Sequence, residues 1–380
     1  MTRPGVDEPI DVLMALNYYT PYVSGLTNVA RDVAEHLAGQ GKRVTVLTTQ
    51  HSPDLARFES VNGVRVFRTK VVGRVDRAPI SPTFVGQAIR LSRHSGVVNL
   101  HLPMPEAGAI ALGLRRGTPL VLTYQCDPPS GLGMKSDVVR TALDLSHRIA
   151  LRKAAAVVVS SIDYAQSSRV LKRFEQAKIV EIPPPSWPRA RGLPQFRQGA
   201  GRHIGFLGRL TSEKGVDLLV RAFRSSADDA DRLLIAGEGL LLAGASALAD
   251  IRRAAQGDPR VVFLGRISDD QIADFYESID VFCVPSTNSF EAFGIVQVEA
   301  MLAGVPVVAA DLPGVRTVVQ STGGGLCFET GDVRSLADAL TQVRDLELDR
   351  DALAAVATQR YGVAESLNQY SLLLDDLDNR

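Results

Sequence analysis

The chain has 380 residues and a formal net charge of zero, with 45% apolar and 22% charged residues, the composition of an ordinary globular protein. It is long enough for two domains with separate cores, and it lacks the uninterrupted apolar run of about 18 residues that a membrane-spanning helix needs. Its three cysteines (Cys126, Cys283 and Cys327) lie far apart without metal-ligand or redox spacing, so we predict a reduced, cytoplasmic compartment.

The zero net charge conceals an asymmetry between the two halves. Residues 1–185 contain 23 Lys and Arg against 15 Asp and Glu, and the remainder contains 19 against 27. Two readings stay open at this point. Either the basic half meets something anionic, or the surface charge drifts without a role.

The first half alternates short β-branched runs with helical stretches. MTRPGVDEPIDVLMALN begins polar and then turns apolar without a small-residue cleavage site, so we predict a first strand rather than a signal peptide. A helix at 24–41 follows and ends at a glycine. The other predicted elements are strands at 10–17, 43–49, 64–70, 97–102, 119–124 and 155–161 and helices at 81–94, 105–116 and 135–153.

A proline-rich segment, PPPSWPRARGLPQFRQGAG, interrupts the alternation from residue 183 and is typical of a linker. The alternation then resumes. The predicted elements are strands at 203–208, 232–237, 261–265, 281–286 and 306–310 and helices at 214–224, 241–255, 269–278 and 294–303. The predicted divisions are a first domain at 1–184, a linker at 185–199, a second domain at 200–361 and a C-terminal segment at 362–380 with a helix at 364–378.

This alternation predicts an α/β fold with two doubly wound parallel-sheet, Rossmann-like domains. Ligands of such sheets bind outside the carboxyl ends of the strands. Gly25 begins a helix after the first strand, where backbone amides could meet an anion or where a glycine is needed for packing. The loops that follow the strands of the second domain carry more informative residues.

Arg209 and Lys214 follow the strand that ends at Gly208, in HIGFLGRLTSEKG. Two cations at the mouth of a parallel sheet could hold a diphosphate, and we expect Lys214 to be exposed in the empty site. The alternative is a solvated loop with a pair to Glu213. RLLIAGEG, which contains Gly237, lacks the third glycine of a dinucleotide fingerprint and argues against an oxidoreductase.

SFEAFGIVQVEAMLAG places Glu291 in a loop and Glu299 inside an apolar helix that begins near Gly294. A carboxylate buried without partners costs several kcal/mol, so we expect a hydrogen-bond partner for Glu299. A cis-diol would satisfy both carboxylate oxygens. A neighbouring loop or an arginine is the alternative partner.

Two further patterns have ordinary explanations. Aspartates at 229–231 and 376–378 resemble DxD triplets, but they follow no strand and we predict solvated charge. The basic amphipathic stretch at 136–156 is either a surface helix or a contact for anionic lipid.

The motifs, in this order, resemble a family 4 retaining glycosyltransferase of the two-domain GT-B fold over essentially the whole chain. The combination is specific although each piece alone is not. The shared pieces are the E-x7-E element EAFGIVQVE with AMLAGVPVVAADLPGV after it, GRLTSEKG, RLLIAGEG, VVFLGRIS and PYVSGLTNVARDVAEHLAGQGKRVTVLT. The resemblance implies domains that face a central cleft, an acceptor-binding first domain, a donor-binding second domain and a terminal helix that crosses back to the first.

The resemblance also implies residue roles. Arg209 and Lys214 would neutralise the diphosphate, and Glu291 would contact the donor sugar; these three are the predicted catalytic residues. Glu299 would bind the ribose hydroxyls. The other implied donor-binding positions are Gly25 from the opposite domain, Gly208, Gly237, the backbone of Arg266 and Ile267 at the base, and the backbone amides of Phe293, Gly294 and Ile295.

One position departs from the family pattern. A T-[YF]-H segment usually supplies a histidine that touches the donor sugar, but this chain has TYQCDPP, with Gln125 in that place. Glutamine forms hydrogen bonds but carries no proton, so the donor sugar differs, the activity is altered, or His101 serves nearby. Tyr22 and Asp127 complete the predicted acceptor-side or sugar-side residues.

We therefore predict a retaining glycosyltransferase that uses a nucleotide-diphosphate sugar, with UDP favoured over GDP, and an acceptor hydroxyl. No metal or cofactor is expected, and neither is nucleic acid. The acceptor is predicted to depend on the loops at 17–27, 73–82 and 125–135. The location is cytoplasmic, with peripheral contact to the inner face of the membrane as an option. The alternatives are a non-hydrolysing sugar-nucleotide epimerase and a catalytically silent nucleotide-sugar binding protein.

Overall fold

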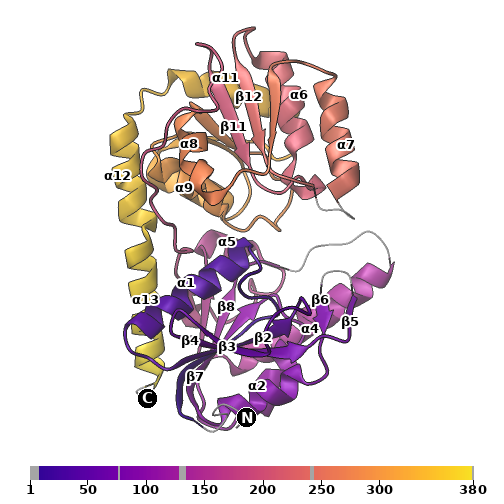
Figure 1. Ribbon diagram of the computed structural model, residues 1–380, viewed down its shortest axis with the longest axis vertical. Helices are drawn as coiled ribbons and strands as arrows, with labels where there is room; N and C mark the ends of the chain where they lie inside the picture. Colours follow the sequence, from indigo (N-terminus) through magenta and orange to yellow (C-terminus); the bar gives the residue numbers. More distant parts are fainter. Residues whose placement is uncertain (1–7, 76–77, 128–133, 240–243, 379–380) are drawn as a thin grey trace. The chain divides into compact units, whose positions relative to one another are not determined.

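The computed structural model describes residues 8–75, 78–127, 134–239 and 244–378. The chain divides into two compact units, each with its own parallel sheet (Figure 1). The first unit consists of Met1–Pro185 and Ser366–Arg380, and the second consists of Ser186–Glu365.

The sheet of the first unit has eight strands in the order β10-β9-β8-β7-β1-β2-β4-β3. Neighbouring strands of this sheet are parallel, except that β3 runs antiparallel to β4 at the edge. The central strands are buried on both faces, which explains their continuous apolar sequences. The strands are β1 (Ile10–Ala15), β2 (Val44–Gln50), β3 (Phe58–Val61), β4 (Val64–Lys70), β7 (Ser95–Leu102), β8 (Leu120–Tyr124), β9 (Ala156–Val159) and β10 (Ile179–Glu181).

The helices of the first unit pack on this sheet. In the first of them, Ser24 caps the N-terminus and forms a capping box with Thr27, which sets the start of the helix at Gly25. The helices are α1 (Gly25–Gly39), α2 (Phe84–Ser92), α3 (Ala107–Gly113), α4 (Met134–Lys153), α5 (Ile162–Ser167) and α13 (Val363–Asp378). A small antiparallel pair is formed by β5 (Gly73–Val75) and β6 (Ala78–Ile80).

The sheet of the second unit has six parallel strands in the order β13-β12-β11-β14-β15-β16. Because β11 lies between β12 and β14, the order reverses at the strand that precedes Arg209, and such a reversal is where doubly wound sheets bind ligands. The strands are β11 (His203–Leu207), β12 (Arg232–Ala236), β13 (Val261–Gly265), β14 (Val281–Val284), β15 (Val307–Ala310) and β16 (Gly325–Phe328).

The helices of the second unit form two groups. In one, α6 packs on α7 and α11, and in the other α12 packs on α9 and α10. Together with the sheet they bury one continuous apolar core. The helices are α6 (Val216–Ser226), α7 (Gly244–Ala255), α8 (Ile272–Glu277), α9 (Ile295–Leu302), α10 (Val315–Thr322), α11 (Val333–Gln342) and α12 (Arg350–Tyr361), with 3-10 turns η2 (Ser212–Lys214) and η3 (Asp269–Gln271).

The predicted linker lies against the second unit over much of its length. Arg189 forms an ion pair with Asp269 (3.0 Å), and the Leu193 backbone N–H donates to the Asp274 carboxylate (2.6 Å). Ser186 forms a β-bridge with Gly362, beside the start of α13. These contacts hold the proline-rich segment in a defined path.

The predicted α/β fold with two doubly wound parallel sheets is confirmed. The helix predicted at 214–224 is instead the 3-10 turn η2 followed by α6, because Gly215 adopts a left-handed conformation (φ 62°) between them. A side chain at Gly215 would overlap the Pro285 carbonyl. The sequence predicted no range for β3, the β5–β6 pair, α5, β10, β16 or α10–α12. Most of these elements are short, and short segments show little periodicity.

Candidate active site

The carboxyl edge of the second sheet brings together loops that are distant in sequence. The loop after β11 carries Arg209 and η2, and the loop after β14 leads through Glu291 to α9. The two loops are joined at Thr287, whose backbone N–H donates to the Glu213 carbonyl (2.9 Å). Arg209, Lys214 and Glu291 thus belong to one side of one sheet edge.

Lys214 forms an ion pair with Glu291 through Nζ and Oε2. Ser286, which is buried, donates its hydroxyl to the same Glu291 oxygen (3.1 Å). The side chains of Lys214 and Glu291 are 20% and 13% exposed. The expectation of an exposed Lys214 is therefore wrong, and so is the alternative pair with Glu213, because the ammonium group lies against Glu291.

The electrostatics of Glu291 follow from this pairing. Burial by itself raises the pKa of Glu291, but the Lys214 ammonium, the Ser286 hydroxyl and the Arg209 guanidinium outweigh it and hold the pKa below its usual value. Arg209 is exposed, and its guanidinium has no hydrogen bond or ion pair to any described residue. Arg209 is thus a cation available to an anionic ligand, beside a carboxylate that stays ionised.

Close backbone contact explains one of the predicted glycines, Gly237. Gly237 has a positive φ of 148°, and a side chain there would overlap the Gly208 carbonyl. The backbone N–H of Gly237 donates to the Gly265 carbonyl (2.8 Å), which links the turn after β12 to the turn after β13. Packing therefore accounts for glycine at 237, whether or not a ligand also approaches.

Glu299 lies on α9 with one oxygen bound by protein. The Tyr276 hydroxyl, from α8, lies within hydrogen-bond distance of Glu299 Oε2 (3.2 Å) and of the Val296 carbonyl (3.1 Å), which share its one proton. Glu299 Oε1 has no hydrogen bond to a described residue. Burial raises the pKa of Glu299, against the opposing influence of Arg189 and the Tyr276 hydroxyl. Half of this carboxylate therefore remains available to a hydroxyl donor.

The start of α9 presents backbone amides. Gly294 precedes the helix with φ 74°, and the Phe293 ring packs edge-on against Tyr361 with centroids 5.6 Å apart. The backbone N–H groups of Phe293 and Gly294 donate to no described residue, and Ile295 begins the helix. A helix N-terminus of this kind suits an anion or an oxygen-rich ligand.

Arg266 and Ile267 follow β13 at the same sheet edge, Arg266 exposed and Ile267 half-buried. Asp269 lies just beyond them, and Arg189 reaches it from the linker. The predicted base-binding loop is therefore attached to the segment that joins the two units.

The first unit places its predicted residues at the carboxyl ends of β1, β7 and β8. Tyr22 is 38% exposed and lies near Tyr18 (ring centroids 4.5 Å apart) in the loop before Gly25. Gln125 is half-buried, and its Nε2 lies 3.4 Å from Nδ1 of the buried His101. Parts of the loops predicted to contact the acceptor, residues 76–77 and 128–133, lie outside the described residues.

Asp127 serves the scaffold of the first unit. It is 4% exposed, and its carboxylate accepts hydrogen bonds from the hydroxyls of Tyr124 (2.6 Å) and Ser168 (2.7 Å) and from the Arg169 backbone N–H (2.9 Å). Three protein donors leave it little capacity for a ligand. We infer that Asp127 fixes the chain around α5.

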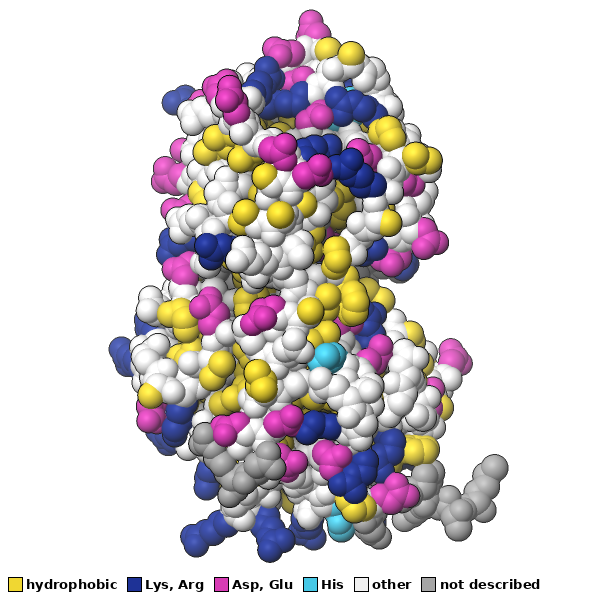
Figure 2. Space-filling view, turned by 90° about the vertical axis from the view of Figure 1, so that its left-hand side faces the viewer, with side chains coloured by type: hydrophobic (Ala, Val, Ile, Leu, Met, Phe, Trp, Pro, Cys, Tyr) yellow, Lys and Arg dark blue, Asp and Glu magenta, His cyan; other side chains and the backbone are white. Residues whose placement is uncertain are grey.

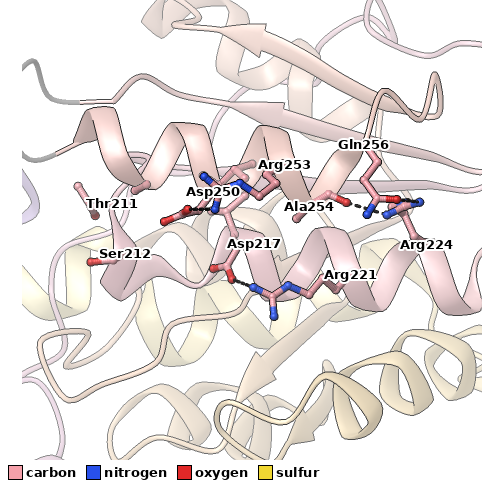
Figure 3. A pocket seen from close by; sticks show the side chains of 12 residues that line it. Thr211, Ser212, Asp217, Arg221, Arg224, Asp250, Arg253, Ala254 and Gln256 are labelled. Atoms are coloured by element: carbon pink, nitrogen blue, oxygen red, sulfur yellow. Dashed lines mark hydrogen bonds and ion pairs between the residues drawn. The ribbon is translucent and has the colours of Figure 1, made fainter.

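A hollow of about 460 Å³ lies away from these residues, between α6 and α7 (Figure 3). Its cations are paired within the protein: Arg221 with Asp217 (2.7 Å) and Arg253 with Asp250 (2.9 Å). Thr211 and Ser212 mark its end nearest to η2. Because these charges satisfy one another, the hollow carries no chemistry comparable with that of the sheet edge.

The two DxD-like triplets differ in burial. Asp376 and Asp378 are exposed, as predicted. The prediction is wrong for Asp231, which is 3% exposed and bonded to the Arg344 guanidinium (2.8 Å) and the Arg202 backbone N–H (2.9 Å). This aspartate joins the starts of β11 and β12 to the segment after α11.

The surface shows no segregation of charge by sign on the face drawn in Figure 2, where basic, acidic and hydrophobic side chains are interspersed. Among the described helices, none has the length and hydropathy needed to cross a bilayer.

Tyr276, Ser286 and Arg189 contribute to the site but were not predicted. Tyr276 and Ser286 stand in ordinary apolar or loop segments, and their roles depend on partners far along the chain. The available signal was the position of Ser286, the last residue of a predicted strand at the ligand-binding edge.

The two doubly wound units of this chain form the GT-B fold. Residues 24–185 match the family described as "Glycosyl transferase 4-like domain", and residues 196–360 match "Glycosyl transferases group 1". The sucrose-phosphate synthase structure from Thermosynechococcus elongatus has a TM-score of 0.74 at 18% identity, covering 97% of this chain and 99% of that one.

Two relatives extend the match across both units. The GDP-mannose-dependent alpha-mannosyltransferase of Mycobacterium tuberculosis is 31% identical and covers 91% of each chain. The phosphatidyl-myo-inositol mannosyltransferase of Mycobacterium leprae is 29% identical over 89% of each chain. This chain belongs to family 4 of the glycosyltransferases.

Proposed function

We propose that the protein transfers mannose from GDP-mannose to an acceptor hydroxyl with retention of anomeric configuration. The observation that carries the donor assignment is the 31% identity, over 91% of both chains, to a relative named for GDP-mannose. This donor replaces the UDP-sugar that the sequence alone favoured. The proposed donor unit is the second one, where cations and carboxylates meet at the sheet edge.

The proposed roles follow from the chemistry of each group. The Arg209 guanidinium, which has no partner among the described residues, and the half-buried Lys214 neutralise the diphosphate as it leaves. Glu299 accepts a ribose hydroxyl at Oε1 while Tyr276 holds Oε2. Glu291 meets the sugar through the carboxylate oxygen that Lys214 and Ser286 leave free.

The remaining donor contacts come from the backbone. The amides of Phe293, Gly294 and Ile295 point from the start of α9 to sugar and phosphate oxygens. The loop at Arg266 and Ile267 contacts the base. In this mechanism the bond between the anomeric carbon and the diphosphate oxygen breaks while the acceptor hydroxyl attacks from the same face, and the leaving diphosphate takes up the hydroxyl proton. The diphosphate gains negative charge as that bond breaks, so stabilising this charge is the main catalytic task.

The acceptor is proposed to be a polyol ring and to meet the first unit. Tyr22, Gln125 and Gly25 all lie at the carboxyl ends of its strands. The relative from Mycobacterium leprae is named for an inositol lipid, which makes inositol-containing compounds the first acceptors to try.

Peripheral membrane contact is proposed for α4. Val138 and Leu145 are 66% and 60% exposed, and at helical spacing they share a face with the exposed Arg148 and Arg152. Apolar and basic side chains on one face favour an anionic lipid surface. Co-sedimentation with phosphatidylglycerol vesicles, but not with phosphatidylcholine vesicles, would support the contact, and equal behaviour with both would contradict it.

The donor is tested by incubating the purified protein with GDP-mannose or UDP-glucose and myo-inositol, and by measuring nucleotide release and products by mass spectrometry. We expect GDP release from GDP-mannose, with little UDP release. An α-linked product in the NMR spectrum would support retention. Release from UDP-glucose alone would contradict the donor assignment, and an altered sugar without release would favour the epimerase.

A further inference from the structure

Gln125 occupies a defined position at the carboxyl end of β8. Its backbone N–H donates to the Leu102 carbonyl (3.1 Å), which continues the pairing of β7 with β8. Its side-chain Nε2 lies 3.3 Å from the Leu26 carbonyl oxygen, in the first turn of α1, and 3.4 Å from His101 Nδ1. One amide group thus contacts a helix and a strand of the same unit.

These two neighbours fix the orientation of the amide. A carbonyl oxygen only accepts hydrogen bonds, so the atom that faces Leu26 is the amide nitrogen. The other hydrogen of this NH₂ group points to His101 Nδ1, which therefore presents its lone pair. A flipped amide would set the glutamine oxygen against the Leu26 oxygen and is disfavoured.

The orientation decides which atom remains for a ligand. With the nitrogen used by Leu26 and His101, Gln125 Oε1 is left, and it accepts no hydrogen bond from any described residue. Gln125 is half-buried, so part of its side chain is accessible. A carbonyl oxygen in this position accepts a hydrogen bond from a hydroxyl and exchanges no proton with it.

We propose that His101 is a positioning residue that, together with the Leu26 carbonyl, turns Gln125 Oε1 toward the ligand and makes this position a proton-free acceptor for one sugar hydroxyl. The inference rests on the proposed function, because it assigns the hydroxyl to the transferred mannose. It explains how the site works without the family's histidine: a second histidine, behind the replaced position, orients the substitute.

His101 Nε2 is buried and has no hydrogen-bond partner among the described residues, so the contact of Nδ1 with Gln125 is the one that sets the tautomer. His101 is 1% exposed, and burial lowers its pKa to about 3, so it is neutral at physiological pH. The strand register places Asn99 and Thr123 on the same face of the sheet, and Thr123 donates to Asn99 (3.0 Å). The titratable group packed on this face is Tyr370 of α13, which also stays neutral because burial raises its pKa.

The first test concerns the hydrogen bond between Gln125 and His101, and it needs no activity assay. In nitrogen-15 NMR spectra of the full-length protein, with His101 assigned by the H101N variant, we expect the Nε2–H tautomer and no titration between pH 5 and 8. An Nδ1–H tautomer, or titration within that range, would overturn the proposal whatever the enzyme transfers. This measurement does not depend on the proposed donor.

The role is then tested by GDP release from GDP-mannose. We expect H101L, which has no acceptor at this position, to lose about 2- to 12-fold in kcat/KM, the range of one uncharged hydrogen bond. H101N keeps an acceptor oxygen near Nδ1 and should remain close to wild type. Equal losses in H101L and H101N, with similar melting temperatures, would show that His101 acts only through packing.

A double-mutant cycle separates positioning from a direct effect. If His101 acts through Gln125, H101L should reduce kcat/KM no further in a Q125A background. GDP-mannose analogues that lack one hydroxyl identify the hydroxyl that Gln125 Oε1 contacts. For one analogue, kcat/KM should be lower than for GDP-mannose with the wild type, but equal to it with Q125A. Additive losses, or discrimination unchanged by Q125A, would overturn the proposal, whereas a wild type inactive on GDP-mannose would instead overturn the donor assignment.

Discussion

The carboxyl edges of the two sheets carry side chains of different chemistry. In the second unit the edge is charged: Lys214 pairs with Glu291, Arg209 stands free of the described residues, and Glu299 keeps one oxygen open. In the first unit the corresponding edge carries an uncharged pair, in which Gln125 contacts a buried, neutral His101. Under the proposed function, the second unit supplies the charges that stabilise the leaving diphosphate, and the first unit supplies an uncharged contact to a sugar hydroxyl. The predictions below test that division.

The largest effect is expected for Lys214→Ala. Removing a cation from the leaving diphosphate should reduce turnover about 100- to 1,000-fold, as loss of one stabilising donor does in other enzymes. The change also leaves Glu291 without its ammonium partner, so the free energy of unfolding should fall by about 1–3 kcal/mol. Steady-state GDP release and thermal melting measure the two effects.

The matched control is the double variant K214M/E291Q, which removes both charges. It should regain most of the lost stability because no unpaired carboxylate remains, but it should stay inactive. Full activity in either variant would contradict the division, since the second unit would then not need its charges.

Asp127→Asn probes the first unit, where we expect an effect on stability. The carboxylate accepts three hydrogen bonds inside the protein, and an amide cannot accept all of them, so unfolding should become easier by about 2–3 kcal/mol. Affinity for GDP should not change. Calorimetric unfolding and GDP titration distinguish this outcome from a ligand-binding role, in which stability would be kept and activity lost.

Glu299→Gln should weaken GDP binding about 10-fold or more, because a hydrogen bond to a carboxylate is worth more than one to an amide. Tyr276→Phe is the comparison variant: it removes the protein donor to Oε2 and leaves Oε1 for the ligand. Its effect on affinity should be smaller. Isothermal titration calorimetry measures both, and unchanged affinity in E299Q would assign Glu299 to a structural role.

The smallest expected effect is on pH dependence, where the two glutamates behave oppositely. Burial raises the pKa of Glu299 above its usual 4.5, against Arg189 and Tyr276 and together with Asp269. GDP affinity should therefore weaken a few-fold as the pH falls through this raised pKa, and E299Q should lack that component. Titrations between pH 7.5 and 5 check it, and identical curves for both proteins would exclude Glu299.

The directions of these two pKa shifts also determine how the stability of the fold depends on pH. Glu299 favours its protonated form in the folded state, so its contribution to stability is complete below 4.5 and is lost as the pH rises through the raised pKa. Glu291 is ionised in the folded state, so its contribution is present above 4.5 and is lost as the pH falls through the lowered pKa.

Much of the architecture could be predicted from the sequence, because parallel strands buried on both faces produce continuous apolar runs. The edge strand β3 and the β5–β6 pair were missed because three or four residues are too few to carry such a signal. At the site, residue types and their loops were predictable, but partners were not. The Lys214–Glu291 pair joins residues 77 positions apart, and only the folded sheet brings their loops together.

The path of the chain through the two units has a consequence for synthesis. The helix α13 belongs to the first unit, where Ser371 bonds to Gln40 and Lys42 pairs with Asp375. Ribosomes make the whole second unit before they make α13. Until α13 is made, the apolar surface of the first unit that α13 covers stays exposed. Premature termination anywhere in the second half would leave that surface exposed, and chaperones or proteases would recognise it.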